Sequence, residues 1–283
     1  MTHYFVYDVF TDQPFGGNQL AVFPDATKLP EGDLQKITQE FNFSEVTFVY
    51  PPADPSHTAR VRIFTPTMEI PFAGHPTIGT AIALHDQGHQ GDMVLELGVG
   101  PIACRVDDSG AAFTTSAPLE RLATPAPALV AAALGLPVNA IRTDRHAPVQ
   151  CSLGLPFVIV ELTDAEALNS CKPALDQIER GAALHPGGLD FALYAYTRSD
   201  KIIFARMFAP LDNIPEDPAT GSAAATLAAL LTEIEKTSQN LIIHQGAAMG
   251  RPSQIEAKTQ NGVPVSVTIS GTAKQVMAGR LVY

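Results

Sequence analysis

Two stretches of the chain are apolar at nearly every position and are built largely from small residues. They are TIGTAIALH at residues 77–85 and SAAATLAALLTEI at residues 222–234. Neither has the continuous polar face of a surface helix, and a helix that is apolar on all sides is normally buried. The pattern therefore predicts two buried central helices, one in each half of the chain.

Short strand-like runs surround both stretches and are separated by turns rich in glycine and proline. In the first half they lie at residues 4–10, 18–24, 45–52, 59–64, 92–97, 99–106 and 111–116. In the second half they lie at residues 154–162, 191–198, 201–210, 240–246, 253–259, 264–271 and 274–283. A further helix is predicted at 31–42, where Leu34, Ile37 and Phe41 recur at helical spacing, and another at 174–184.

The segment between the halves is APLERLATPAP, residues 117–127. Its richness in proline and alanine predicts a linker. The chain then divides into an N-terminal half, residues 1–118, and a C-terminal half, residues 128–283. The pattern leaves open whether the last strand returns to the first half.

An internal echo connects the halves. VRIFTPTMEIP at 61–71 is repeated as ARMFAPLDNIP at 205–215, so that Arg62 matches Arg206 and Phe64 matches Phe208. A slip of three residues then brings Gly74 onto Gly221, and the two apolar helices coincide. Chance resemblance is the alternative, but identities gathered in one short window favour a duplication. Duplicated halves are expected to face each other across a cleft, which is where small ligands bind.

Each central helix is preceded by a glycine. The first turn of a helix carries backbone amides without partners and a partial positive charge, so it can bind a carboxylate or phosphate. Gly74 and Gly221 would let such an anion approach the backbone, and Ser222 adds a hydroxyl donor. The alternative is that these glycines only permit close helix packing.

Three ionisable residues lie beside these helix starts in the sequence or open a nearby strand. His75 follows Gly74, Asp217 lies just before Gly221, and Glu45 opens the strand VTFVY. A carboxyl group beside an apolar strand is partly desolvated, which raises its pKa towards that of a useful base. Each residue also has a structural interpretation, as a cap or an edge residue for Glu45 and as a helix cap for His75 and Asp217.

Composition narrows the possible partners. Apolar residues make up 46% of the 283-residue chain, charged residues 17%, and the net charge is −11. This charge argues against nucleic acid or an anionic membrane surface as a partner. No apolar run is long enough to span a bilayer, and three widely spaced cysteines favour a reducing cytoplasm.

Five blocks, in order along the chain, closely resemble the phenazine biosynthesis (PhzF) family. They are GGNQLAVF (16–23), NFSEVTFV (42–49), RIFTPTMEIPFAGHPTIGTAIAL (62–84), EDPATGSAA (216–224) and QGAAMGRPS (245–253). The resemblance implies the α+β fold of diaminopimelate epimerase. That fold has two similar halves, each a curled, mostly antiparallel sheet around a central helix, with the site between them.

The resemblance also implies an activity. The best-known relatives isomerise a dihydro-hydroxyanthranilic acid by moving a proton between carbons, without a metal or an organic cofactor. By motif, Glu45 in SEVTF resembles the proton-shuttling acid/base, and His75 in AGHP and Asp217 in EDPATG resemble its helpers. The implied partner is therefore a small carboxylic acid.

The same resemblance suggests substrate-binding residues. Gly74, Gly221 and Ser222 resemble the carboxylate cradle, and Asn18 and Gln245 are candidate contacts to the ring substituents. A homodimer is expected from the resemblance alone.

Two alternatives stay open. The related epimerases carry two cysteines at the helix starts, where this chain has Ala73 and, near the second helix, Pro218. A two-thiol racemase is therefore not expected, but epimerisation by carboxylates stays open as an alternative. The other alternative is a non-catalytic module that binds a small acid or a protein.

His85 and His89 are interpreted as residues of a helix end rather than as metal ligands, because Gly88 lies between them.

Overall fold

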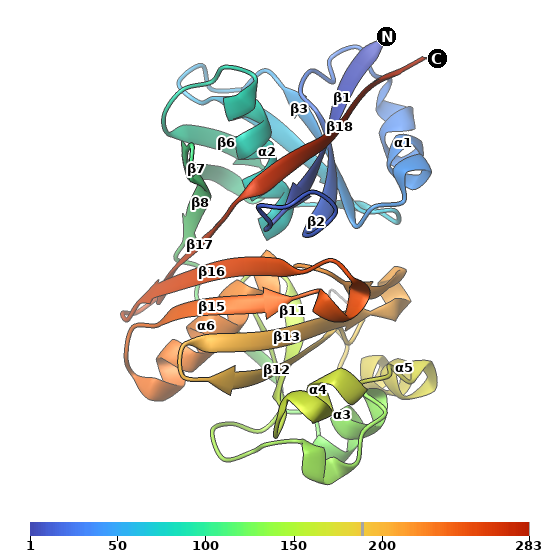
Figure 1. The fold of residues 1–283 in the computed structure, drawn as a ribbon, viewed down its shortest axis with the longest axis vertical. Helices are drawn as coiled ribbons and strands as arrows, with labels where there is room; N and C mark the ends of the chain where they lie inside the picture. Colours follow the sequence, from blue (N-terminus) through green and yellow to red (C-terminus); the bar gives the residue numbers. More distant parts are fainter. Residues whose placement is uncertain (188–189, 283) are drawn as a thin grey trace. The chain divides into compact units, whose positions relative to one another are not determined.

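The computed structural model describes residues 1–187 and 190–282, which form two units. The first unit contains residues 1–115 and the residues from 268 onward, and the second contains residues 116–267. The first unit is therefore discontinuous in sequence: the chain leaves it after Thr115 and returns at Thr268 (Figure 1). The sequence left open whether the last strand returns to the first half. In the structure, the last strand pairs with the first strand of the chain.

The first unit contains ten strands or parts of strands and two α-helices among the described residues. The strands are β1 (Thr2–Val9), β2 (Asn18–Phe23), β3 (Glu45–Tyr50), β4 (Ala59–Phe64), β5 (Glu69–Ile70), β6 (Met93–Leu97), β7 (Gly100–Asp107), β8 (Gly110–Thr115), most of β17 (Ser266–Gly271) and β18 (Ala273–Leu281). The helices are α1 (Leu34–Phe41) and α2 (Gly74–Asp86). The predicted strand at 274–283 ends in a residue outside the described part of the chain.

The sheet of the first unit curls around α2. Its strands follow the order β18, β1, β2, β3, β4, and β5 and β6 share the far edge of β4 before β7 and β8 continue the sheet. Of these strand pairs, β2–β3 and β4–β6 are parallel and the others are antiparallel. Helix α2 contacts strands from both ends of this sheet, including β1, β2, β7 and β8. The predicted sheet around a central helix is therefore confirmed.

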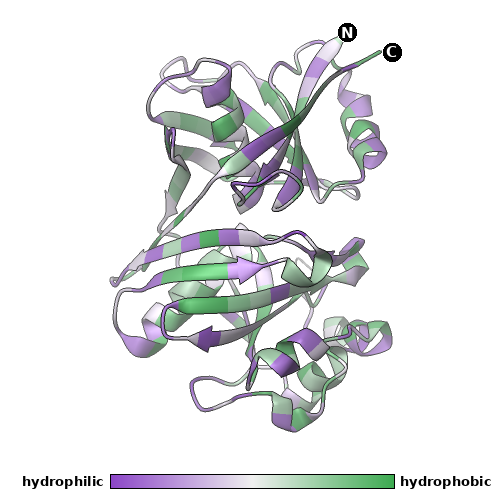
Figure 2. Cartoon of the chain, in the orientation of Figure 1, coloured by the Kyte–Doolittle hydropathy of each residue, from purple (hydrophilic) through white to green (hydrophobic). Residues whose placement is uncertain are grey.

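Hydrophobicity explains the different positions of the two helices. All residues of α2 from Gly74 to Leu84 are buried, as expected for a helix that is apolar on all sides. Helix α1 is amphipathic and alternates between hydrophilic and hydrophobic residues (Figure 2). It buries Leu34 and Ile37 against an aromatic cluster that includes Phe23 and Phe48.

The second unit repeats this plan with more helices. Its strands are β9 (Glu120–Ala123), β10 (Val149–Ser152), β11 (Pro156–Glu161), β12 (Leu193–Ser199), β13 (Ile202–Ala209), β14 (Ile214–Asp217), β15 (Asn240–Gln245) and β16 (Ser253–Gln260). Its α-helices are α3 (Pro127–Ala133), α4 (Ala165–Ser170), α5 (Leu175–Leu184) and α6 (Gly221–Glu235). Helix α6 is the buried central helix and contacts β11 and β16, while α3, α4 and α5 contribute to a separate apolar cluster with β11 and β12.

The strand registers of the two units match, which supports the duplication inferred from the sequence. Phe64 pairs with Val46 in the first unit, and its counterpart Phe208 pairs with Leu193 in the second. Both β2–β3 and β11–β12 are parallel pairs, as are β4–β6 and β13–β15.

The register also locates the slip of three residues. Ile63 pairs with Ile70, whereas its counterpart Met207 pairs with Asp217. The hairpin of the second unit is therefore longer by three residues before this pair. Ile70 corresponds to Asp217 and not to Ile214, the partner that an ungapped alignment of the echo gives.

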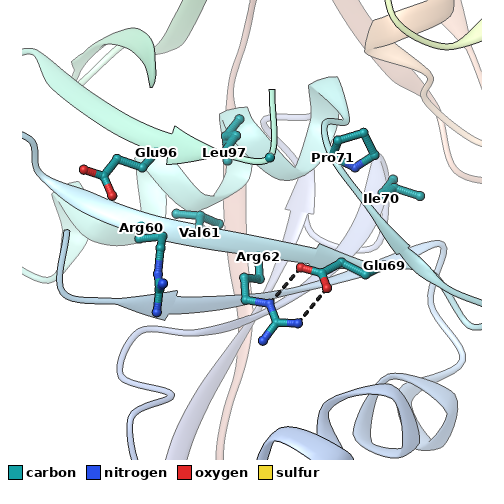
Figure 3. A pocket seen from close by; sticks show the side chains of 9 residues that line it. Arg60, Val61, Arg62, Glu69, Ile70, Pro71, Glu96 and Leu97 are labelled. Atoms are coloured by element: carbon teal, nitrogen blue, oxygen red, sulfur yellow. Dashed lines mark hydrogen bonds and ion pairs between the residues drawn. The ribbon is translucent and has the colours of Figure 1, made fainter. Parts of the chain in front are cut away.

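A pair of arginine–glutamate contacts marks the same position in each unit. Arg62 donates from Nε and Nη2 to the two carboxylate oxygens of Glu69, at 2.7 and 2.6 Å (Figure 3). Arg206 donates in the same way to Glu216, at 2.8 Å for both bonds. This two-bond geometry is specific to the planar guanidinium group, so we call these pairs the arginine forks. Their recurrence places Glu69 and Glu216 in equivalent positions.

One sequence prediction was wrong. The proline- and alanine-rich segment 117–127 was expected to be a linker, but it contains β9, which pairs with β10. The four residues of β9 show no alternation of apolar and polar positions, so there was no strand signal in the sequence there. Their pairing partner, β10, lies more than 20 residues further along the chain. Among the described helices, none is long and apolar enough to cross a membrane.

Candidate functional site

The first group of candidate residues lies where α2 begins. Ala73 is extended and precedes the helix, Pro76 occupies the first turn, and Thr77 donates from its hydroxyl to the Ala73 carbonyl at 2.7 Å. Proline suits this position because the first amides of a helix have no partner within it. Gly74 and His75 are both buried there.

Glu45 is brought to this helix start by β3. It is the first residue of the strand and is aligned with Leu20 of β2. Its carboxyl oxygen Oε2 lies 3.3 Å from Nδ1 of His75, and its side chain is only 12% exposed. This is slightly beyond the roughly 2.7–3.2 Å of most hydrogen bonds, and such contacts often tighten only when a substrate is bound.

Asn18, the first residue of β2, completes this group. Its side-chain nitrogen lies 3.4 Å from the same His75 nitrogen, and its side-chain oxygen accepts a hydrogen bond from Ser44 at 3.4 Å. Asn18 is 2% exposed. The three predicted residues Asn18, Glu45 and His75 are therefore neighbours, and each comes from the beginning of its element. We call them the first-unit group.

His75 is neutral at neutral pH. Burial lowers its pKa from the ordinary value of 6.5 to about 3, and a hydrogen bond with the backbone of Gln19 opposes this effect only in part. Although Glu45 and His75 are close enough for an ion pair, the ring is too strongly desolvated to hold the charge that such a pair needs. The contact is better described as a carboxyl group beside a neutral imidazole, which can donate or accept one hydrogen bond at each nitrogen.

The second group lies where α6 begins. Asp217 is the last residue of β14, Gly221 and Ser222 open the helix, and Gln245 ends the neighbouring strand β15. Asp217 and Gln245 are almost fully buried, with 4% and 2% exposure, whereas Ser222 is half-buried. We call these four residues the second-unit group.

Thr220 joins Asp217 to Gln245. Its hydroxyl donates to Asp217 Oδ2 at 2.5 Å and accepts from Gln245 Nε2 at 2.9 Å. Gln245 Nε2 also donates to the Asp217 carbonyl at 2.7 Å, and its oxygen accepts from the Thr220 amide at 3.3 Å and from Tyr194 at 3.4 Å. The amide of Gln245 thus uses both donors and its acceptor within the unit, and the contact to a substrate that the sequence predicted for it stays a prediction.

Two residues of this network were not found from the sequence. Thr220 had a faint signal, since it lies three residues after Asp217 and directly before the helix. Tyr194 had none, because it lies in an apolar strand 51 residues from Gln245. Burial and the charge of Asp217 raise the pKa of Tyr194 above its ordinary value, so its hydroxyl stays protonated and can donate.

A separate cavity of about 550 Å³ lies in the first unit (Figure 3). It opens beside β4 in the gap between β5 and β6, and the Arg62–Glu69 fork lies on its wall. None of the candidate residues lines it. Within the described residues, no group of three or more His, Cys, Asp or Glu residues is arranged to hold a metal ion.

Comparisons with known proteins agree with the motifs. The sequence model of the phenazine biosynthesis-like proteins (PhzC-PhzF) matches residues 7–279. An uncharacterised isomerase of Mesorhizobium japonicum is 38% identical, and the alignment covers 99% of this chain and 98% of that protein. The trans-2,3-dihydro-3-hydroxyanthranilate isomerase of Pseudomonas aeruginosa is 35% identical, with 99% of each chain covered. The structure of a predicted epimerase from Pseudomonas aeruginosa is 30% identical, covers all of both chains and superposes with a TM-score of 0.82.

Proposed function

The chain belongs to the phenazine biosynthesis-like protein family and is an isomerase, and from this premise we propose that it moves a proton between two carbon atoms of a small, cyclic carboxylic acid. The observation that carries the proposal is the contact between Glu45 and the buried, neutral His75 at the start of α2. A carboxyl group that is mostly removed from water beside a neutral imidazole suits proton transfer at carbon.

Each member of the first-unit group has a role in this proposal. The carboxylate of the substrate binds at the amides of the first turn of α2, where the helix dipole favours negative charge. Glu45 takes a proton from one carbon, the electrons shift through the conjugated system, and Glu45 returns a proton to another carbon. Nδ1 of His75 lies beside the Glu45 carboxyl group, and Asn18 contacts the same ring nitrogen and so orients the imidazole. Atoms and electrons balance without an oxidant or reductant.

Asp217, Gly221 and Ser222 of the second-unit group are also proposed to take part in the reaction. Asp217 would assist proton transfer, and the start of α6 at Gly221 and Ser222 offers a second set of backbone amides and a hydroxyl. These roles rest on the motif EDPATG and on the burial of Asp217. The homodimer expected from the family resemblance is likewise a proposal, which light scattering on the purified protein would test.

Deuterium incorporation tests the proposed reaction. The protein is incubated in heavy water with trans-2,3-dihydro-3-hydroxyanthranilate, the substrate named for the relative from Pseudomonas aeruginosa, and with other cyclic acids. A working proton shuttle places deuterium on a carbon of the product, which nuclear magnetic resonance detects. The absence of label from every acid that binds would favour a non-catalytic binding module instead.

Substitution of Glu45 tests the assigned base. An acid/base group contributes roughly 100- to 10,000-fold to the rate, so Glu45→Gln should lose most turnover and keep substrate binding. Glu40→Gln is the matched control, because Glu40 lies exposed on α1 and undergoes the same chemical change. A Glu45→Gln variant that isomerises the substrate as fast as the unmodified protein would overturn the assignment.

Epimerisation is the second candidate, because the solved structure at 30% identity is that of a predicted epimerase. The same labelling experiment separates the two reactions. An epimerase leaves deuterium on the carbon that lost the proton and inverts its configuration. An isomerase leaves it on a different carbon and moves a double bond.

A further inference from the structure

The duplication provides an internal comparison for the polar network around Asp217. Three registers relate the units at this point, namely those of β3–β4 with β12–β13, β4–β5 with β13–β14, and β4–β6 with β13–β15. These registers make Asp217 equivalent to Ile70 and Tyr194 equivalent to Thr47. Extending the β4–β6 and β13–β15 registers by one residue makes Gln245 equivalent to Leu97. The aligned helix starts at Gly74 and Gly221 make Thr220 equivalent to Ala73.

The counterparts in the first unit are mostly apolar. Ile70, Ala73 and Leu97 are all buried, with 9%, 4% and 7% exposure. The same backbone arrangement therefore forms with a purely hydrophobic set at these three positions. Burying polar groups costs free energy unless every hydrogen bond is made, so the fold alone gives no reason for the polar set in the second unit. Its position at Asp217 points to function.

Helix capping does not explain Thr220 either. Threonine is a common residue before a helix because its oxygen can accept from an amide of the first turn. Thr220 is at this position in α6, but its side chain makes no such bond. The hydroxyl is directed to Asp217 instead, and α2 begins in the same way after an alanine.

The hydrogen bonds have a defined direction. Gln245 Nε2 has two hydrogens, which go to the Asp217 carbonyl and to the Thr220 hydroxyl. The Thr220 oxygen already accepts one bond, and its single hydrogen goes to Asp217 Oδ2 at 2.5 Å. Such a short O–H···O distance is typical of a charge-assisted bond to a carboxylate. The Gln245 oxygen can only accept, so the Tyr194 hydroxyl donates to it and supports Gln245 from the other side.

From this comparison we infer that Thr220 is a positioning residue for Asp217, held in place by Gln245 and Tyr194. Its hydroxyl fixes the orientation of the Asp217 carboxylate and favours the ionised form by donating a hydrogen bond to it. The inference rests on the proposed function in one respect, that Asp217 acts on the substrate. It also assigns Gln245 to the support of Asp217 rather than to the substrate.

Substitution of Thr220 is the first test. Thr220→Val keeps the shape and removes the donor, whereas Thr220→Ser keeps the donor. The valine variant should lower kcat roughly 10- to 100-fold with little change in KM, because the lost bond is one to a charged group, and the serine variant should restore most of the rate. Thr232→Val is the matched control, since this threonine lies in the same helix, is fully buried and donates to a helix carbonyl. Should the valine variant fold poorly, Thr220→Ala replaces it, because the first unit has alanine at the equivalent position.

A second measurement needs no substrate and so separates this inference from the proposed reaction. Carbon-13 labelling of aspartate gives a carboxyl resonance for Asp217, assigned by its loss in Asp217→Asn. The titration of this resonance should move to higher pH in Thr220→Val and stay in place in Thr220→Ser and Thr232→Val. An unchanged titration in Thr220→Val, or turnover equal to that of the unmodified protein, would overturn the inference. Loss of activity in Thr220→Ser equal to that in Thr220→Val would also do so.

Discussion

The buried ring of His75 should make the stability of the protein depend on pH in a predictable direction. Its pKa is about 3 in the folded protein, and its ordinary value of 6.5 applies when the chain is unfolded. The unfolded chain therefore binds more protons than the folded one between these two values. Stability conferred by the neutral ring is present in full above pH 6.5 and is lost as the pH falls towards 3.

The size of the effect follows from the same two values. Each unit of difference corresponds to about 1.4 kcal/mol. At pH 5 the unfolded ring is largely protonated and the folded ring is not, so a gap of about 1.5 units contributes. The free energy of unfolding should therefore fall by about 2 kcal/mol between pH 7.5 and pH 5 because of His75 alone. Other groups titrate over this range, so the effect must be measured as a difference between variants.

His75→Asn is the appropriate variant, because asparagine keeps a polar group near the position of Nδ1 and does not titrate. Urea unfolding followed by circular dichroism at pH 7.5 and pH 5 gives the four free energies needed. The unmodified protein should lose about 2 kcal/mol more than the variant. Repeating the comparison with Glu45→Gln in both proteins removes the neighbouring carboxyl group and isolates burial as the cause. Equal losses in the unmodified protein and in His75→Asn would refute the reasoning.

Three further predictions concern stability and reactivity. Gly246→Ala should destabilise the protein by several kcal/mol more than Gly250→Ala, as measured by urea unfolding. Both glycines have positive φ angles, but a Cβ at Gly246 would meet backbone oxygens at 2.3 and 2.6 Å, whereas one at Gly250 would meet nothing within 4 Å. Similar losses in the two variants would show that the close approach is relieved at little cost. Replacing Arg206 by methionine should cost more thermal stability than the same change at Arg62. The Arg206 fork is less exposed and Arg206 also donates to backbone carbonyls, whereas the second partner of Arg62 is the exposed Glu31. A reversed order would contradict this. The three cysteines are buried, and burial raises the pKa of each thiol. A thiol reagent at pH 8 should therefore label the native protein far more slowly than the protein in urea. Rapid labelling of the native protein would argue against their burial.

Sequence patterns predicted the parts of the fold that depend on local composition. The central helices α2 and α6 were found because they are apolar on every side, and α1 was found from its spacing of Leu34, Ile37 and Phe41. The duplication was visible because the arginine of each fork recurs at the same distance from a phenylalanine. Such features are encoded within one segment and need no knowledge of the partners.

Features that depend on distant partners were missed. Strand β9 exists because β10 pairs with it, and its own residues show no strand pattern. Helix α4 has only six residues, and its clearest signal is the Asp164 cap that accepts from Ala167. The three-residue difference in hairpin length was known, but only the strand register shows that it places Asp217 opposite Met207. The network around Asp217 was beyond reach for the same reason, since Tyr194 and Gln245 come from separate strands.

The return of β18 to β1 has a consequence for synthesis of the chain. During synthesis β1 emerges from the ribosome long before β18, although the two strands pair with each other (Figure 1). Residues 116–267 can complete their own unit while the polypeptide is still being made. Until β18 emerges, β1 presents an open edge to the nascent chain's surroundings, and such edges can pair with strands of other chains. A truncated product ending near residue 267 should therefore contain a finished second unit joined to an unfinished, aggregation-prone first one.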